Sequence, residues 1–202
     1  MNHQSANYTD RAVSQEHGQV VDEELSAENE ARRRVALAQI RQWPDPVLKL
    51  RAEEVVEFDD DLRRLVERMQ ALMAEARGIG LAGNQAGVLR RVFVFRIEDE
   101  DEPRAAVNPA IVAPSEELET ADEGCLSIPE YYEEVERPAQ VKVRFTDLDG
   151  KAHEVEANGL LATVLQHEID HLNGVLFIDH ISKLKRDRVI KKFTKAAKRE
   201  AV

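Results

Sequence analysis

The sequence contains a single cysteine, so no disulfide bond can form within the chain. Aromatic residues make up only 5% of the 202 residues while hydrophobic residues make up 43%, which predicts a mainly aliphatic core. No run approaches the roughly 18 apolar residues of a membrane span. The opening MNHQSANYTDRAVSQEHGQ lacks the apolar segment of a secretory signal peptide. These absences predict a cytoplasmic protein with no membrane partner.

Negative charge predominates, and the net charge of −11 argues against general nucleic-acid binding. The end of the chain differs, because SKLKRDRVIKKFTKAAKREAV holds nine lysines and arginines but only two acidic residues. Its apolar residues recur at helical spacing: Leu184, Val189, Ile190, Phe193 and Ala197. Residues 182–202 are therefore predicted to form a basic helix docked on the body. A sharper interpretation adds contact with a polyanion such as ribosomal RNA.

Residues 1–33 are polar and have no clear apolar stripe, so they are predicted to form a disordered or loosely helical extension. Residues 34–181 are long enough for one domain with its own core. Pro44 and Pro46 indicate an irregular stretch near its start.

The clearest helix in this domain is predicted over residues 60–77. Its apolar residues recur every three or four positions: Leu62, Leu65, Val66, Met69, Leu72, Met73 and Ala76. Asp60 or Asp61 can cap its start, and Gly78 is expected to end it.

Strands are predicted after that helix. Residues 90–97 and 105–114 are rich in β-forming residues, and the prolines of the second segment suit an edge strand or a break. Residues 140–157 alternate apolar and polar side chains on both sides of Asp149-Gly150, which is a strong hairpin signal. Gly159 then leads into another helix.

That helix carries QHEIDHLNG, which places two histidines one turn apart. His167 and His171 share a helix face and can bind one metal ion, and Glu168 directly follows the first histidine. The surrounding NGLLATVLQHEIDHLNG has two apolar faces, so the helix is expected to be central and buried. A buried histidine pair is costly without a partner, and a metal ion satisfies it.

The third ligand decides the class of site. One group of H-E-x-x-H metalloproteases uses a histidine six residues after the second, but Phe177 occupies that position here. Another group uses a downstream glutamate, and only Glu200 follows the motif. Cys125, in EGCLSIP, is a natural thiolate ligand for a borderline-soft divalent ion, although taken alone a small buried hydrophobe is the favoured interpretation.

Three segments in this order resemble the peptide deformylase family: GIGLAGNQAGV (78–88), EGCLS (123–127) and QHEIDHLNG (166–174). The resemblance runs from about Val35 to about Ser182. It implies an α+β fold, with short antiparallel sheets around a central metal-binding helix and with helices at both ends. It also implies hydrolysis of the formyl group from the N-terminal formylmethionine of nascent polypeptides, with release of formate. The implied cofactor is one divalent ion, Fe²⁺ in preference to Zn²⁺.

The residues and the resemblance together assign the chemistry. Cys125, His167 and His171 would hold the metal and leave a fourth position open for water. Glu168 would take the proton of that water and deliver it to the leaving amine. The resemblance implies that the side-chain amide of Gln85 and the backbone N–H of Leu126 stabilise the developing oxyanion.

The resemblance also implies how the substrate lies. Gly78, Ile79 and Gly80 would pair with its backbone like an added strand, and Gly124 would face it from the other side. Leu160, Thr163 and Val164 are candidates for lining the methionine pocket, although core packing explains them almost as well.

One residue departs from the family pattern. Gly83 stands where the family usually has alanine, and its extra backbone freedom costs about 0.5–1 kcal/mol locally, which is enough to loosen Gln85 and reduce activity. The alternatives to a deformylase are another H-E-x-x-H hydrolase, such as a peptidase, and a non-catalytic peptide- or ribosome-binding protein.

Overall fold

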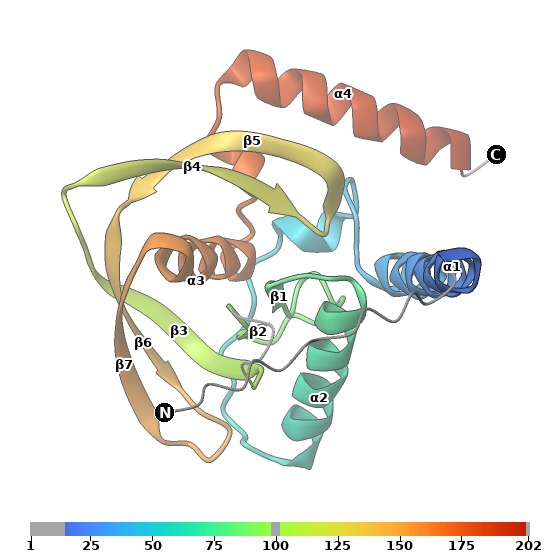
Figure 1. Cartoon of the computed structure of the whole chain (residues 1–202). Helices are drawn as coiled ribbons and strands as arrows, with labels where there is room; N and C mark the ends of the chain where they lie inside the picture. The colour runs from blue at the N-terminus through green and yellow to red at the C-terminus, as the bar shows by residue number, and fades with distance from the viewer. Residues whose placement is uncertain (1–14, 98–101, 201–202) are drawn as a thin grey trace, which may run out of the picture.

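The computed structural model describes residues 15–97 and 102–200, and Figure 1 shows an α+β arrangement. The described helices are α1 (Gln15–Gln39), α2 (Asp60–Glu75), α3 (Gly159–Leu172) and α4 (Lys183–Glu200). Two short 3-10 helices, η1 (Pro46–Lys49) and η2 (Phe177–Asp179), lie between them. The predicted fold class is therefore confirmed.

Antiparallel strands form two sheets. The larger sheet has the order β1-β2-β3-β6-β7, with strands β1 (Gly80–Ala82), β2 (Val92–Phe95), β3 (Arg104–Pro114), β6 (Gln140–Thr146) and β7 (Ala152–Asn158). The smaller sheet is a hairpin of β4 (Leu118–Cys125) and β5 (Ile128–Pro138), inserted between β3 and β6. The predicted hairpin at Asp149-Gly150 is confirmed, because β6 pairs with β7 along its whole length.

Strand β3 corrects one expectation. It lies between β2 and β6, so it is an inner strand and not an edge. The predicted break is present, because the register shifts between Val107 and Ala110. Pro109 lies inside that irregularity, where the missing N–H of proline costs no ladder hydrogen bond.

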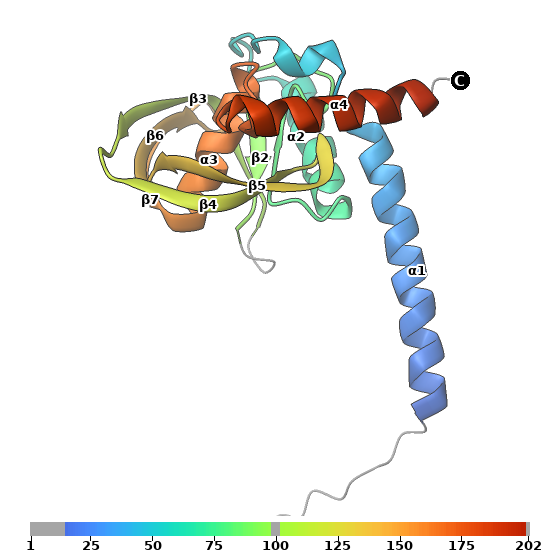
Figure 2. The ribbon, with the colours of Figure 1, turned by 90° about the horizontal axis from the view of Figure 1, so that it is seen from above.

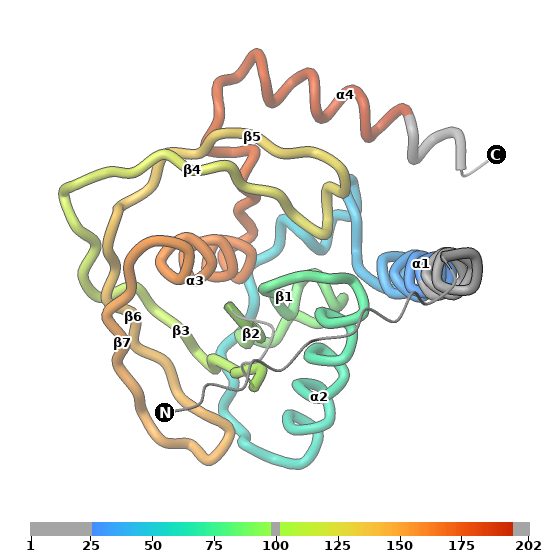
Figure 3. Tube along the Cα trace, viewed as in Figure 1, coloured from blue at the N-terminus to red at the C-terminus, as the bar shows by residue number. Residues whose placement is uncertain are grey.

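Helix α3 lies at the centre of the molecule, between the β4–β5 hairpin and the larger sheet (Figures 1 and 3). Ala162, Leu165, Ile169 and Leu172 are buried, and they belong to one core cluster with Phe93 and Val143 of the sheet. The two apolar faces of this segment predicted a central and largely buried helix, and the structure confirms it.

Helix α2 has the predicted core stripe but different ends. Asp59 is the N-cap instead of Asp60 or Asp61, because its Oδ1 accepts a hydrogen bond of 2.9 Å from the backbone N–H of Leu62. At the other end the chain turns through Arg77, which has φ of 57°. The backbone N–H of Gly78 then donates to the carbonyl of Met73 at 2.9 Å, which closes the last turn.

Helix α1 reaches back into the segment expected to be disordered or loosely helical. Residues 15–33 belong to α1, while residues 1–14 of that predicted extension lie outside the described residues. Ala36 and Ile40 are buried near its end, and Figure 2 shows that this end lies beside α2. The apolar contacts gather in the last turns, so the preceding residues gave no stripe from which a docked helix could be predicted.

Helix α4 packs across the β4–β5 hairpin. Val189 is buried, and Ile190 and Phe193 pack against the same core cluster. Leu184, which was placed in the predicted stripe, is instead 65% exposed, and the side chain of Ala197 lies outside the described residues. In the parts of the chain that the structure describes, no helix is long and apolar enough to cross a membrane.

Candidate active site

One cysteine and two histidines meet where the end of β4 faces α3. The ligand atoms of Cys125, His167 and His171 all lie within 4.8 Å of one another. The Sγ atom of Cys125 lies 3.2 Å from Nε2 of His171. The β4–β5 register shifts between Gly124 and Cys125, and the backbone N–H of Ser127 points to Sγ at 3.4 Å. This tight turn aims the thiol at the helix.

The donor set fits a divalent metal ion. Both imidazoles are buried, and a thiolate with two imidazoles suits Zn²⁺ or Fe²⁺. Burial opposes ionisation of the Cys125 thiol, but His171 and His167 hold its pKa well below the usual value. The thiolate form that a metal requires is therefore favoured here.

A buried ionic network orients His167. Its Nδ1 lies 2.9 Å from Oε2 of Glu123, so an Nδ1–H donated to that carboxylate leaves Nε2 free as the ligand atom. Arg137 donates from NH2 to Oε2 of Glu123 at 3.0 Å and from NH1 to Oδ2 of Asp170 at 2.8 Å. Burial raises the pKa of Glu123, but the hydrogen bonds from His167 and Arg137 outweigh it and lower the pKa to about 2.

The sequence did not predict this network. Glu123 lies two residues before the candidate ligand Cys125 inside EGCLS, and that position could have identified it. Arg137 had no local signal, because its partners belong to β4 and to α3 and meet it only in the folded chain. Phe177, the position of a histidine in another class, is buried with its ring centroid 6.1 Å from that of His167.

Gln85 is held with its amide N–H groups toward the cysteine. Its Oε1 accepts a hydrogen bond of 2.8 Å from the backbone N–H of Ala82. Its Nε2 then donates to Oγ of Ser127 at 3.2 Å and to Sγ of Cys125 at 3.5 Å. Because the oxygen is already bonded, the nitrogen is the end that faces the site.

Gly83 has a packing reason to be glycine. Its backbone N–H donates to the carbonyl of Val92 at 2.9 Å. A Cβ atom at Gly83 would lie 2.5 Å from the carbonyl oxygen of Arg90 and 2.9 Å from that of Val88. The close approach of these backbones therefore favours glycine at this position.

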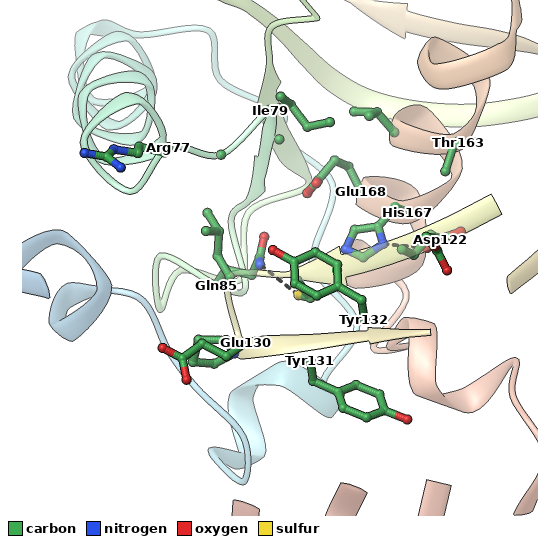
Figure 4. A pocket seen from close by; sticks show the side chains of 18 of the residues that line it. Arg77, Ile79, Gln85, Asp122, Glu130, Tyr131, Tyr132, Thr163, His167 and Glu168 are labelled. Atoms are coloured by element: carbon green, nitrogen blue, oxygen red, sulfur yellow. Dashed lines mark hydrogen bonds and ion pairs between the residues drawn. The ribbon is translucent and has the colours of Figure 1, made fainter. Parts of the chain in front are cut away.

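Glu168 is buried beside β1. Its Oε1 and Cδ atoms fill the space that a Cβ atom at Gly80 would occupy, so glycine is needed there. Burial raises the pKa of Glu168 to about 7, against the opposing effect of His167 and His171. Among the described residues its buried Oε2 has no hydrogen-bond partner, and Figure 4 shows the carboxylate directed into the cavity.

A cavity of about 340 Å³ lies in front of these groups. The predicted substrate-binding and catalytic residues line it together: Gly78, Ile79, Gly80, Gln85, Gly124, Leu126, Leu160, Thr163, Val164 and Glu168. His171 lies behind the surface and is 1% exposed. Strand β1 is at the edge of its sheet, so its outer side is available for pairing with an extended peptide.

Several lining residues were not predicted. Tyr132 faces Gly124 in the hairpin register, and its ring occupies the place of a side chain at that glycine. Arg33 and Arg77 line the same cavity from α1 and from the turn after α2. None of these belongs to a recognisable motif, so only the folded chain identifies them.

Comparisons with known proteins agree with this geometry. A family model described as polypeptide deformylase matches residues 37–187. Peptide deformylase from Nitrobacter hamburgensis is 56% identical over 171 residues, which cover 81% of this chain and 98% of that protein. Peptide deformylase from Brucella suis is 58% identical over 161 residues, covering 78% and 92%.

Solved structures show the same likeness. Peptide deformylase from Legionella pneumophila has a TM-score of 0.75 at 42% identity, covering 80% of this chain and 96% of that chain. The Ehrlichia chaffeensis enzyme in complex with actinonin has a TM-score of 0.75 at 40% identity, covering 78% and 96%. The chain therefore belongs to the polypeptide deformylase family, whose members are enzymes that remove N-formyl groups.

Proposed function

We propose that this chain hydrolyses the formyl group from the N-terminal formylmethionine of nascent polypeptides. The C–N bond of the formamide breaks, water supplies the oxygen of formate, and the peptide leaves with a free amine. The observation that carries the proposal is the convergence of Cys125, His167 and His171 within 4.8 Å, beside a buried glutamate and a cavity.

We propose one divalent metal ion as the cofactor, Fe²⁺ in preference to Zn²⁺. Cys125, His167 and His171 would hold it, and the family resemblance supports iron. An ion with three protein ligands supplies a Lewis acid that lowers the pKa of water toward neutral. The network of Glu123, Arg137 and Asp170 supports this role, because it fixes the ring of His167 and neutralises the buried charges around it.

Glu168 is proposed to move the proton. It would accept a proton from the attacking water and deliver it to the amine nitrogen of the leaving peptide. Its pKa of about 7 supports both transfers near neutral pH, since a group titrating there both accepts and releases a proton readily. Its carboxylate also lies against Gly80, which would bring it beside the first residue of a peptide bound along β1.

Two donors are proposed to stabilise the oxyanion. The side-chain amide of Gln85 already directs its nitrogen toward Cys125, and the backbone N–H of Leu126 follows the cysteine directly. Each donor of this kind lowers the barrier by about 3 kcal/mol. The bond from Ala82 to Gln85 Oε1 supports the assignment, because it prevents the amide from presenting its oxygen to the developing negative charge.

The substrate is proposed to lie extended between β1 and β4. Gly78, Ile79, Gly80 and Gly124 would contact its backbone from the two sides, while Leu160, Thr163 and Val164 would line the pocket for the methionine side chain. Val164 is 5% exposed and Leu160 is 52% exposed, so the pocket would run from an accessible rim into the core.

The setting of the reaction is also a proposal. We propose a cytoplasmic enzyme that meets its substrate at the ribosome through the basic face of α4. Support comes from the exposure of Lys183, Arg188, Lys191 and Lys192 on that helix, whereas Val189 is buried. A polyanion would be attracted to this face, and the contact would weaken with added salt.

Formate release under anaerobic conditions tests the function. Iron-loaded protein is expected to release formate from formyl-Met-Ala-Ala-amide and to leave the acetylated and unblocked peptides intact. Glu168→Ala should keep its metal but lose turnover by about 100- to 10,000-fold. Glu67→Ala, an exposed glutamate on α2, is the matched control and should change neither property. Retained turnover in Glu168→Ala would contradict the proposed proton transfer, as would loss of its metal.

A further inference from the structure

Two arginines stand at one end of the substrate cavity. Arg33 lies on α1, and Arg77 lies in the turn that ends α2. Figure 4 shows Arg77 on the side of the cavity away from Thr163 and Asp122. The match to the family model begins at residue 37, so Arg33 belongs to a part of the chain outside that match.

The two side chains share one carboxylate. Oε1 of Glu30 lies 3.1 Å from NH1 of Arg77, and Oε2 of Glu30 lies 4.0 Å from NH1 of Arg33. The carboxylate of Glu30 is therefore shared between two guanidinium groups, and neither has it as a sole partner. Among the described residues the buried Nε of Arg33 has no hydrogen-bond partner, so its N–H group still lacks an acceptor.

The position of Arg33 is set by helix geometry. Ala36 and Leu37 follow it by three and four residues, so the three side chains share one face of α1. Ala36 is buried against the body and Leu37 lines the same cavity, so this face of α1 turns Arg33 toward the cavity. The side chain of Arg33 is 31% exposed, whereas its neighbour Arg34 is exposed and does not line the cavity.

The arginines lie away from the reacting bond. Gly80 lies against Glu168, which marks the level of the scissile formamide. Arg77 precedes Gly80 by three residues, in the turn that leads from α2 to β1, and Figure 4 shows it on the far side of the cavity from His167. Arg33 lies with it, because both arginines face Glu30. A peptide pairing with the open edge of β1 would bring its second or third residue after methionine to this level.

We propose that Arg33 and Arg77 form a binding site for an acidic side chain at the second or third residue after formylmethionine. This inference rests on the proposed function, and it adds a preference among formylated chains. The guanidinium groups would bind the carboxylate through charge-assisted hydrogen bonds. Glu130 also lines this cavity and would oppose an acidic substrate, so the preference should be moderate.

Peptides that differ by one charge test the preference. The matched pairs are formyl-Met-Ala-Glu-Ala-amide against its glutamine analogue, and formyl-Met-Ala-Ala-Glu-amide against its glutamine analogue. One glutamate peptide is expected to show a kcat/KM about threefold to fivefold higher than its partner, mainly through a lower KM. Arg33→Gln and Arg77→Gln should each bring the ratio toward one, and Arg33→Lys should retain part of it.

Three further variants separate recognition from a structural role. Arg34→Gln removes the same charge from the exposed neighbour and should leave the ratio unchanged. Glu30→Gln releases both guanidinium groups and should raise the ratio, whereas a purely structural change would affect both peptides equally. Arg33→Glu should disfavour the glutamate peptide and favour a lysine analogue.

The outcomes of the two proposals can be told apart. Turnover of the glutamine peptides reports the deformylase function by itself, and equal kcat/KM within both pairs would then overturn the arginine site alone. If no peptide releases formate, calorimetric titration of the same pairs into full-length protein still measures the preference. Equal affinities there would overturn the site, as would an effect of Arg34→Gln as large as that of Arg33→Gln.

Discussion

Helices α3 and α4 are close in sequence and both carry apolar residues at helical spacing, yet their polar residues differ in burial. In α3 the polar residues Gln166, His167, Glu168 and His171 are all buried. In α4 only Val189 is buried among the residues whose side chains are described, and the exposed residues there include Lys183, Lys185, Arg188, Lys191, Lys192 and Lys195. The charged residues of α4 are solvated, whereas those of α3 require partners inside the protein.

Those partners explain why α3 can be central. Gln166 donates to the carbonyls of Ala162 and Pro138, both at 3.0 Å, and His167 pairs with Glu123. An unpaired buried polar group costs several kcal/mol, so a helix with this composition is stable inside only when most of these groups are bound. Oε2 of Glu168 and Nδ1 of His171 are the exceptions on the described part of this helix. Burial of polar groups therefore identifies the reactive helix more clearly than its apolar pattern does.

The largest expected effect comes from removing a ligand on α3. His171→Ala should lower metal affinity more than about 100-fold, because two protein ligands remain, and formate release should fall about 1000-fold or more. Metal content per chain, measured by mass spectrometry of the dialysed protein, checks the first effect. His153→Ala, a histidine paired with Asp147 on the β6–β7 hairpin, is the control and should keep the metal. If His171→Ala still bound one metal ion per chain, the proposed contrast between a reactive α3 and a solvated α4 would be contradicted.

The next effect concerns the ionic network beneath α3. Arg137→Leu leaves the carboxylate of Glu123 buried without its cation, and the free energy of unfolding should fall by about 3–5 kcal/mol. Chemical denaturation followed by circular dichroism measures it. Arg144→Leu removes the exposed pair with Glu154 and should cost less than about 1 kcal/mol. Similar losses in the two variants would mean that the network contributes no more than a surface pair.

The smallest effect compares the apolar contacts of the two helices directly. Leu165→Ala on α3 should destabilise the protein by about 2–5 kcal/mol, because the cavity would lie in a closely packed core. Val189→Ala on α4 removes fewer buried atoms and should cost about 1–2 kcal/mol. Leu184→Ala, at a 65% exposed position, should change stability little. Thermal unfolding of the three variants ranks them, and an equal cost for Leu165→Ala and Val189→Ala would contradict a central α3.

Local pattern predicted those elements whose stabilising contacts repeat at a short period. The stripe of α2, the two faces of α3 and the alternation of β6 and β7 are all of this kind. It was less informative where contacts are few or remote, as in α1, which docks through Ala36 and Ile40 near its end. The N-cap of α2 differed by one residue, because three successive aspartates each satisfy the local requirement.

The sequence by itself determined the composition of the site: one cysteine, a histidine pair with a glutamate between them, and the motifs around them. Their spacing along a helix or a turn is a local property, so it could be read before folding. Only the tertiary structure decided that Arg137 bonds to both Glu123 and Asp170, and that Arg33 lines the cavity. It also decided that a side chain at Gly83 would clash with neighbouring carbonyl groups. These contacts join residues far apart in the chain, and no periodicity encodes them, since they depend on how whole elements pack.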